Sequence, residues 1–375
     1  MSLKKIGIIG AGPAGAWLAF KLAKAGFEVL LFDHKAPWEK PCAGGLADVI
    51  WHDCPELEPL KEQGFPNRKV RIITVKNEAL AAELSRPLYT VSREKLGQFT
   101  IDLACAAGAR FHKTRVEKLE SKGRGFELQD RAGEIFAVDF LAGAEGISSR
   151  VRRMFCEPWS RMDYFYTLSL LWPKPTSLPL TFRFFSGLEG YAWIFPGRES
   201  FSLGIGSRGK QFQAGQFFSL FEKALDSDPE LAEIKPRLRK QAVSWLIPAL
   251  RFSTLRQQKV ASDNWALIGD ASGAAHAVSG GGIPYALKTA SLLAEALKAG
   301  RPEQYQALWW RLCKDELAGA ALWGPLFYRP FIQGMLSGYL LKSGSAKKLV
   351  VRLLSGEHPP RREIFSGLAK MLLGF

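Results

Sequence analysis

Cysteine is scarce in this 375-residue chain, which contains only five. No two of them form a C-x-x-C pair, so the sequence indicates neither a disulfide framework nor a metal or iron–sulfur site. A reducing cytoplasm fits this composition best. The sequence also lacks an uninterrupted apolar run of about 18 residues, so no segment is expected to span a bilayer. Residues 1–5 carry positive charge, but the apolar run that follows is short and is interrupted by glycines from residue 10, which is not the pattern of a signal peptide.

Acidic residues are few relative to basic ones, since 36 Asp and Glu against 51 Lys and Arg leave a net charge of +15. Such an excess of positive charge favours binding to nucleic acid, to an anionic membrane surface or to an acidic protein. No nucleic-acid-binding module is recognisable, so no nucleic-acid partner is expected. Hydrophobic residues at 47% and charged residues at 23% indicate a globular chain, whose length suits two domains.

The first segment with a chemical meaning is a glycine-rich turn near the N-terminus. A buried strand is expected over residues 6–9, the pattern G-x-G-x-x-G follows at 10–15, and a helix is expected over 16–25. A second strand is expected over 27–32 and ends at Asp33. This order of strand, glycines, helix, strand and acid predicts a Rossmann-like dinucleotide cradle.

Each residue of that turn has a physical role in the cradle. Gly10 permits the tight turn, Gly12 lets a pyrophosphate approach the backbone, and Gly15 lets helix and strand pack closely. Ala14 belongs to the same turn and is also expected at the cofactor, and the start of the helix after it offers free N–H groups and a positive dipole to the phosphates. Asp33 can accept hydrogen bonds from ribose hydroxyls. The turn alone does not separate FAD from NAD.

A second match to the same glycine pattern, at residues 204–209, lacks a good helix start and a following strand that ends in an acid. We interpret it as a strand end with a turn, so no separate NAD(P)H domain is expected.

Two later segments indicate that the dinucleotide is a flavin and not NAD. They are L-A-G-A-E-G-I-S-S-R-V-R-R at 141–153, and W-A-L-I-G-D-A-S-G at 265–273 with S-G-G-G-I at 279–283. Together with the N-terminal turn, these motifs resemble the geranylgeranyl reductase family, within the larger group of flavoproteins that includes aromatic hydroxylases. The resemblance implies FAD as the cofactor.

The later segment explains how it could hold a flavin. Asp270, at the end of an apolar strand, can bind the ribityl hydroxyls. Gly282 and Ile283 belong to a glycine-rich turn before a helix expected over 284–299. Its free N–H groups can face the pyrimidine edge, where the positive dipole stabilises negative charge on the reduced ring.

Shorter matches extend the resemblance. K-P-C-A-G-G-L at 40–46 resembles the family's K-P-C-G-G-G stretch, which passes close to the isoalloxazine, so Cys42, Ala43 and Gly45 are expected beside the flavin. Arg93 matches the family arginine that contacts FAD.

Val116 and His276 complete the set of predicted cofactor-binding and catalytic residues. The backbone of Val116 matches a position that meets the adenine. Cys42 and His276 are the candidate catalytic residues; the alternative for Cys42 is a small buried hydrophobe.

The segment Y-A-W-I-F-P at 191–196 resembles the family's Y-x-W-x-F-P. Tyr191, Trp193 and Phe195 alternate, so on a strand they share one face. The resemblance places that face along the substrate pocket; composition alone would favour an aromatic core stripe.

The sequence also departs from the family pattern at four positions. Glu145 replaces the Asp of the middle motif, Gly97 replaces an Asp, Ala43 replaces a Gly, and Ala277 replaces a Pro. These departures leave the substrate open.

The expected fold class is α/β: a Rossmann-like FAD-binding domain, a mixed or antiparallel β-sheet substrate domain and a helical C-terminal region. The FAD-binding domain is expected at 1–75, 90–155 and 260–300, the substrate domain at 76–89 and 156–259, and the helical region at 301–375. Strands are expected at 164–172, 180–185, 191–195 and 201–205, and a helix at 217–225.

The tail from residue 301 is apolar and helical in pattern, and basic residues interleave. They include Arg329, Lys342, Lys347, Lys348, Arg352, Arg361, Arg362 and Lys370. One interpretation is a helical cap on a substrate tunnel, and the other is a basic amphipathic surface on an anionic membrane, at its inner, cytoplasmic face. Both can hold for a lipid substrate.

The leading hypothesis is an enzyme that reduces carbon–carbon double bonds of an isoprenoid or lipid substrate, with NAD(P)H or a small redox protein as electron donor. A flavin monooxygenase or halogenase acting on an aromatic substrate is the alternative. An electron carrier to quinone and a non-catalytic FAD-binding protein are the remaining classes, and the former lacks the spaced cysteines of its cluster site.

Overall fold

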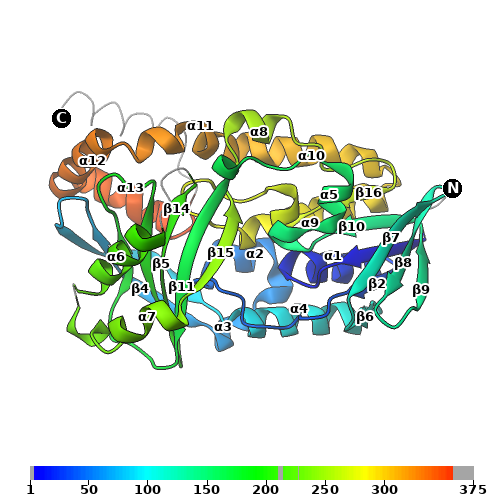
Figure 1. Ribbon diagram of the computed structural model, residues 1–375, viewed down its shortest axis with the longest axis horizontal. Coiled ribbons are helices and arrows are strands. Elements are labelled where there is room, and N and C mark those ends of the chain that lie inside the picture. Colours follow the sequence, from blue (N-terminus) through cyan, green and yellow to red (C-terminus); the bar gives the residue numbers. More distant parts are fainter. Residues whose placement is uncertain (1–3, 210–213, 227, 358–375) are drawn as a thin grey trace. The chain divides into compact units, whose positions relative to one another are not determined.

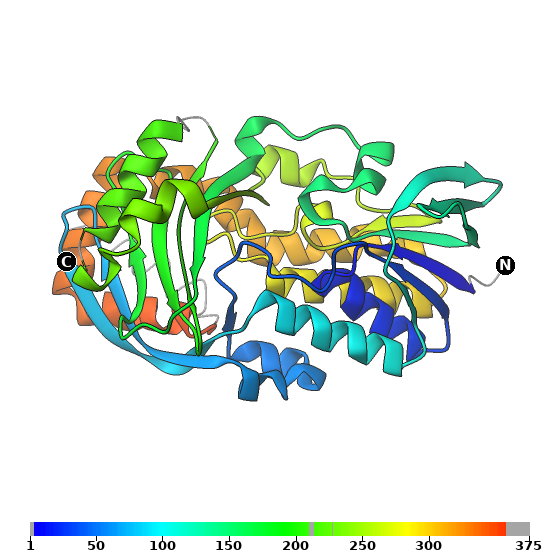
Figure 2. The same cartoon turned by 60° about the horizontal axis from the view of Figure 1, so that its bottom comes forward.

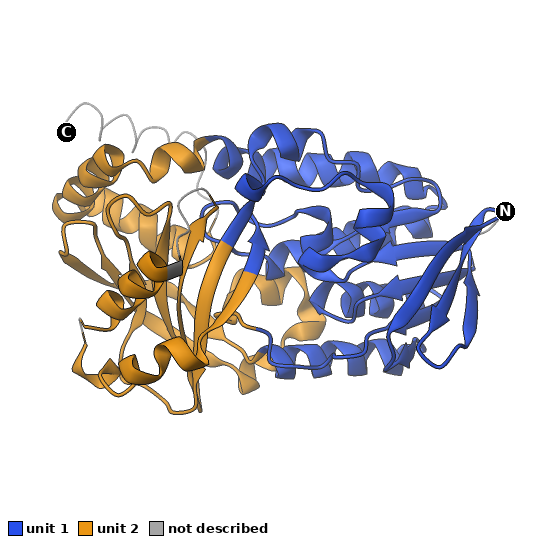
Figure 3. Ribbon diagram, in the orientation of Figure 1, with its two compact units in different colours: residues 1–40, 93–165, 246–322 blue, residues 41–92, 166–245, 323–375 orange. Residues whose placement is uncertain are grey.

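The computed structural model describes residues 4–209, 214–226 and 228–357, which fall into two compact units (Figure 3). Unit 1 comprises Met1–Lys40, Arg93–Phe165 and Leu246–Leu322, and unit 2 comprises Pro41–Ser92, Tyr166–Trp245 and Trp323–Phe375. Residues 41–75, which the sequence assigned to the FAD-binding domain, lie in unit 2, because the strand at Phe65–Ile73 pairs with that unit's sheet.

Unit 1 is built on a parallel sheet of five strands in the order β16-β10-β1-β2-β6 (Figure 1). The strands are β1 Lys5–Ile9, β2 Glu28–Phe32, β6 Arg110–His112, β10 Phe140–Gly143 and β16 Trp265–Leu267. β1, β2, β10 and β16 read as short apolar runs, as is typical of parallel strands covered on both faces.

Three helices pack together in unit 1: α1 (Pro13–Ala23) lies against α4 (Arg93–Ala106) and α9 (Ile283–Lys298), as Figures 1 and 2 show. α1 begins at Pro13, three residues earlier than expected, because proline is favoured at a first helical position. The remaining elements of unit 1 include β7 Val116–Lys122, β8 Gly125–Asp130, β9 Ile135–Val138, α5 Arg150–Phe155, α8 Phe252–Arg256 and α10 Tyr305–Leu312. A π-helical turn at Cys313–Leu317 links α10 to α11 (Ala318–Phe327), which ends in unit 2.

Most of a mixed eight-stranded sheet, in the order β15-β11-β14-β13-β12-β4-β5-β3, belongs to unit 2. The strands are β3 Gly45–Ala47, β4 Phe65–Ile73, β5 Ala79–Thr90, β11 Tyr164–Trp172, β12 Leu180–Arg183, β13 Gly190–Pro196, β14 Phe201–Arg208 and β15 Val243–Pro248. β12 runs parallel to β4, whereas β13 runs antiparallel to both β12 and β14. The second glycine pattern lies in β14 and the turn after it, which agrees with its interpretation as a strand.

Helices cover both faces of this sheet. On one face, α6 (Ala214–Leu225) and α7 (Lys235–Gln241) pack over a buried cluster that includes Ala192 and Ile194. On the other, side chains of α12 (Pro330–Lys342) and α13 (Gly344–Leu354) pack over a cluster that includes Trp193 and Phe195. Shorter helices are α2 Val49–Asp53 and α3 Leu60–Gln63.

The described part of the C-terminal region is helical, as the sequence predicted. Arg361, Arg362 and Lys370 of the basic tail lie outside the described residues. Over the described part of the chain, no helix has both the length and the apolar character needed to cross a membrane.

Candidate functional site

The carboxyl ends of the parallel strands in unit 1 carry the predicted cofactor residues. Gly10 follows β1, Asp33 follows β2, Ala144 follows β10, and Asp270 comes shortly after β16. Because neighbouring parallel strands end at one edge of a sheet, these segments gather at the position where open α/β sheets bind their ligands.

The three glycines of the N-terminal turn are required for different reasons. Gly10 has φ of +101°, and a Cβ there would lie 2.4 Å from the carbonyl oxygen of Ala144. A Cβ on Gly15 would lie 1.8 Å from the oxygen of Gly10. Gly12 has φ of −69°, and a Cβ there would meet no atom of the protein within 4 Å. The fold therefore needs Gly10 and Gly15, whereas Gly12 leaves room for a group that approaches the backbone.

Asp33 is held in a fixed orientation by backbone N–H groups. Its Oδ2 accepts from Ala11 at 2.8 Å, and its Oδ1 accepts from Lys35 at 2.8 Å and Ala36 at 2.9 Å. A carboxylate has about four acceptor positions. One position thus stays available for a ribose hydroxyl, which fits the predicted role of Asp33.

Asp270 lies between the glycine-rich turn and a lysine from the K-P-C stretch. Its Oδ1 is 3.1 Å from where a Cβ on Gly282 would stand, and its Oδ2 is 3.3 Å from the Nζ of Lys40. Both charged side chains are mostly buried, at 20% exposure for Lys40 and 17% for Asp270. Sequence reasoning assigned Lys40 no role, although its position next to Cys42 in a recognised motif was a signal.

The neighbouring helix starts complete this arrangement. Gly282 precedes α9 and gives it no side-chain cap, and Pro284 at the second helical position has no N–H, so the N–H groups of Gly282 and Ile283 remain the ones predicted to face a ligand. Ala14, at the start of α1, lies near Gly269, where a Cβ would be 3.0 Å from the Cβ of Ala14. These contacts bring the first and last motifs together within unit 1.

Arg93 opens α4 and has an unsatisfied donor. Its backbone N–H donates to Glu39 Oε1 at 3.0 Å, and the N–H of Glu94 donates to Oε2 at 3.3 Å. Among the described residues, the buried Nε of Arg93 has no hydrogen-bond partner. Since a buried donor without a partner is costly, an acceptor from a bound molecule suits this position.

Glu145 and Val116 are joined by Arg150. The carboxylate of Glu145 accepts hydrogen bonds from the Ser149 hydroxyl and from the Arg150 N–H. The longer side chain that replaces the family Asp therefore binds the first residues of α5. Burial raises the pKa of Glu145, while these hydrogen bonds oppose that rise. The carbonyl of Val116 accepts from the guanidinium of Arg150, which occupies one acceptor position of the group expected to meet the adenine.

His276 shapes the turn that leads into α9. Its Nδ1 accepts from the N–H of Ser279 at 3.1 Å, its carbonyl accepts from the N–H of Gly280 at 2.9 Å, and its N–H donates to Gly281 at 3.0 Å. Burial lowers the pKa of His276 to about 4. The imidazole is therefore neutral near pH 7, and its contacts favour positioning of the turn over proton donation.

Unit 2 brings the K-P-C stretch against the aromatic strand. The N–H of Gly44 donates to the sulfur of Cys42 at 3.4 Å, and Gly44 has φ of +69°. A Cβ on Gly45 would lie 2.5 Å from Cε1 of Phe195. Ala43 packs against the same cluster as Phe195. Two motifs far apart in sequence therefore share one surface.

The three aromatic residues of β13 lie on this face, as predicted from their alternation. The rings of Tyr191 and Trp193 have centroids 6.1 Å apart, and Trp193 and Phe195 are only 9% and 7% exposed. Burial raises the pKa of Tyr191, and the Cys42 sulfur raises it further, so the phenol keeps its proton near pH 7. The indole of Trp193 also packs over Gly204, which gives it a core role.

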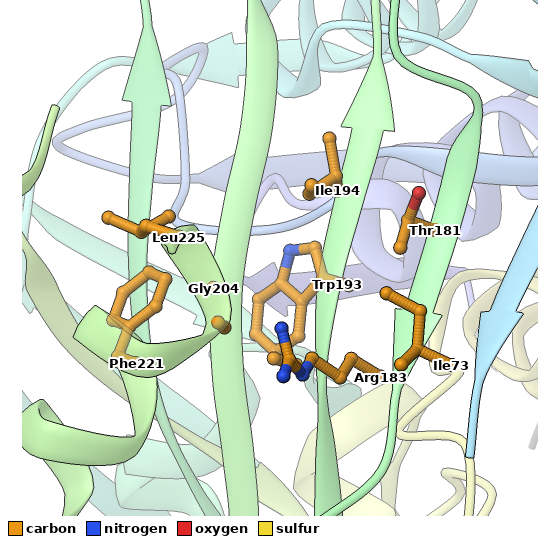
Figure 4. Close-up of a pocket in the computed structure, with 10 residues that line it drawn as sticks. Ile73, Thr181, Arg183, Trp193, Ile194, Gly204, Phe221 and Leu225 are labelled. Atoms are coloured by element: carbon orange, nitrogen blue, oxygen red, sulfur yellow. The ribbon is translucent and has the colours of Figure 1, made fainter. Parts of the chain in front are cut away.

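A small cavity lies around β12, β13 and β14 and beside α6 in unit 2 (Figure 4). Thr181, Arg183, Ile194, Phe221 and Leu225 are among its lining residues. It has room for about one water molecule, so it is far too small for an isoprenoid chain.

Comparison with known proteins identifies relatives over most of the chain. Residues 8–37 match the NAD(P)-binding Rossmann-like domain family. The chain is 26% identical to the menaquinone reductase of Mycolicibacterium smegmatis, over 83% of this chain and 80% of that protein. It is 27% identical to the geranylgeranyl diphosphate reductase of Synechocystis, over 79% of this chain and 75% of that protein.

Solved structures show the same fold. A geranylgeranyl bacteriochlorophyll reductase-like protein from Thermoplasma acidophilum superposes with a TM-score of 0.74 at 19% identity, covering 98% of this chain and 96% of that one. A probable FAD-dependent monooxygenase from Pseudomonas aeruginosa gives 0.68 at 17% identity, covering 89% and 99%. The resemblance found in the motifs and the α/β fold class are confirmed.

Proposed function

We propose that the chain binds FAD and reduces carbon–carbon double bonds in an isoprenoid chain on a lipid or quinone, because it is similar to geranylgeranyl and menaquinone reductases. The observation that carries this proposal is the contact in unit 2 between the K-P-C stretch and the aromatic strand, made by Gly45 and Phe195. It places Ala43, the residue after Cys42, and Tyr191 in one apolar cluster.

The substrate chemistry explains why such a surface is useful. An isolated alkene has no carbonyl to polarise, so positioning must supply most of the rate enhancement. Reduced FAD, when bound, supplies the hydride. The chain has to hold the alkene, exclude water and provide a proton. Tyr191 keeps its proton near pH 7, and Cys42 directly precedes Ala43 of the same apolar cluster, so these two groups are the proposed proton sources.

The external electron donor would be NAD(P)H or a small redox protein. The donor and the length of the isoprenoid chain belong to the same proposal. A lipid substrate also implies peripheral attachment at the inner face of a membrane.

An anaerobic experiment tests the proposal. Protein reduced with dithionite is mixed with a geranylgeranyl lipid or a menaquinone, and flavin absorbance and product mass are followed. We expect flavin reoxidation with a product heavier by two hydrogens per reduced double bond. Reoxidation without such a product, or no reoxidation by any isoprenoid substrate, contradicts the proposal.

The flavin monooxygenase alternative is favoured by one observation, the shared fold of the Pseudomonas aeruginosa protein. It predicts substrate-dependent oxygen consumption and incorporation of oxygen into an aromatic compound. A halogenase would require halide as well. Oxygen uptake measured with the reduced protein, with and without each substrate class, separates these activities from alkene reduction.

A further inference from the structure

Helix α12 buries two polar residues and exposes an apolar one, unlike a normal surface helix. Its buried residues are Gln333 and Ser337, which are four positions apart and share a face. Phe331 is 75% exposed, and Met335 and Leu336 are only partly buried. A soluble helix usually buries its apolar face, so this helix has an apolar surface suited to a non-aqueous environment.

The preceding helix continues the same surface. Trp323 is 57% exposed and Leu326 is 47% exposed, three positions apart near the end of α11. Phe331 follows directly after the break between α11 and α12. We call these three residues, Trp323, Leu326 and Phe331, the apolar turn.

Basic side chains accompany the apolar turn. Arg329 lies between its members and is exposed, and Lys342 and Lys348 are exposed at the end of α12 and in α13. The described segment 323–357 contains five basic residues and one acidic residue, Glu357. This sign of charge complements an anionic surface.

The inner side of the same segment meets the aromatic face. The ring of Phe327 makes an edge contact with Phe184, with centroids 6.1 Å apart, and Phe184 in turn contacts Tyr191. Tyr328 is 3% exposed, and burial, with a smaller contribution from Tyr191, raises the pKa of its phenol. One short segment of unit 2 thus contacts the proposed substrate surface and carries exposed apolar side chains.

We propose that the apolar turn inserts into the headgroup and acyl-chain boundary of an anionic bilayer, and that a lipid chain enters from there to the Tyr191 face. At 13 residues, α12 is about 20 Å long, too short to cross a hydrocarbon core of about 30 Å, so it lies in the interface. The docking step stands independently, whereas the entry step rests on the proposed function.

Vesicle flotation with the full-length holoprotein tests the docking step. Vesicles of phosphatidylcholine alone are compared with vesicles that also contain phosphatidylglycerol. The variant Trp323→Ser/Phe331→Ser should lose binding to the anionic vesicles by about tenfold or more. Arg329→Gln and Lys342→Gln should each weaken it about fivefold and reduce its sensitivity to salt.

Matched control variants remove exposed apolar side chains elsewhere in unit 2. Leu171 is 45% exposed and Val243 is 49% exposed, so Leu171→Ser and Val243→Ser should leave vesicle binding unchanged. Equal losses in controls and test variants overturn the proposal. A change from dimer to monomer in Phe331→Ser, with vesicle binding intact, also overturns it, because the turn would then join copies of the chain.

The entry step needs a second readout. Trp323→Ser/Phe331→Ser should turn over a short, detergent-dispersed isoprenoid substrate at the parent rate and lose activity only on substrate embedded in anionic vesicles. Parallel loss on both substrates contradicts delivery by the turn. If the parent protein reduces neither substrate, the proposed function fails, while flotation still decides whether the turn docks on membranes.

Discussion

Replacing Gly12 by valine should weaken FAD binding strongly while leaving the fold intact. The backbone of Gly12, with φ of −69° and ψ of −179°, is open to any residue, and an added Cβ meets no atom of the protein within 4 Å. The free energy of unfolding without FAD should therefore change by less than about 1 kcal/mol. The side chain would occupy the space into which the pyrophosphate must approach.

The loss of affinity follows from the hydrogen bonds that this side chain prevents. Two charge-assisted bonds from backbone N–H groups to phosphate, at about 1.5–3 kcal/mol each, correspond to a loss of roughly a hundredfold to ten-thousandfold. Equilibrium titration of the apoprotein with FAD, followed by flavin fluorescence, measures this loss. Denaturant unfolding of the same apoprotein measures stability.

Two other glycines provide controls for Gly12. Gly15→Ala should destabilise the apoprotein severely, because its Cβ would stand 1.8 Å from a backbone oxygen. Gly319→Ala in α11 meets no atom within 4 Å, so it should leave FAD binding unchanged and stabilise the helix by up to about 1 kcal/mol. Full FAD occupancy in Gly12→Val, or parental stability in Gly15→Ala, would refute the reasoning.

Three further predictions concern other residues of the site. Asp270→Ala should weaken FAD binding by about 1–3 kcal/mol in the same titration, and unchanged affinity would remove Asp270 from the cradle. For His276, the pKa is lowered from 6.5 to about 4, so the unfolded chain takes up its proton first as the pH falls. The stability that the neutral ring contributes is complete above about pH 6.5 and declines towards about pH 4, by at most about 3 kcal/mol and by less where solvent screens the half-buried ring. Unfolding of the parent and of His276→Asn over this range should show a difference that shrinks with falling pH; a constant difference contradicts the buried neutral ring. Cys42→Ala should slow single-turnover oxidation of the reduced flavin by an isoprenoid more than Cys42→Ser does if the thiol relays a proton, with FAD content and melting temperature near the parent's; equal parental rates would end that role.

Local patterns in the sequence were sufficient for the N-terminal cradle. The run from β1 through Gly10, Gly12 and Gly15 to Asp33 is contiguous, so each glycine could be matched to a turn, an approach or a packing contact. The same holds for β11, whose bounds were predicted as 164–172. Residues 41–75 were predicted to belong to the FAD-binding domain but lie in unit 2. The reason is that β4 pairs with β5 and β12, and local sequence patterns do not determine which strands pair.

Long-range contacts in the site could not be read from the sequence. Lys40 reaches Asp270 across 230 positions, and Glu39 holds the start of α4 through the N–H of Arg93. The burial of Gln333 and Ser337 in α12 could not be predicted either, since the composition indicates an apolar helix without telling which residues are covered. Such features depend on how elements pack, which local periodicity does not determine.

The contact between Gly45 and Phe195 has a consequence for how this sequence can evolve. Because a Cβ at position 45 would overlap the ring at 2.5 Å, a larger residue there is tolerated only if the side chain at 195 shrinks. The two positions should therefore covary among homologues, with alanine at one matched by a smaller residue at the other. Directed evolution towards bulkier substrates should likewise recover paired substitutions at these two sites, and libraries that randomise only one of them would miss most functional solutions.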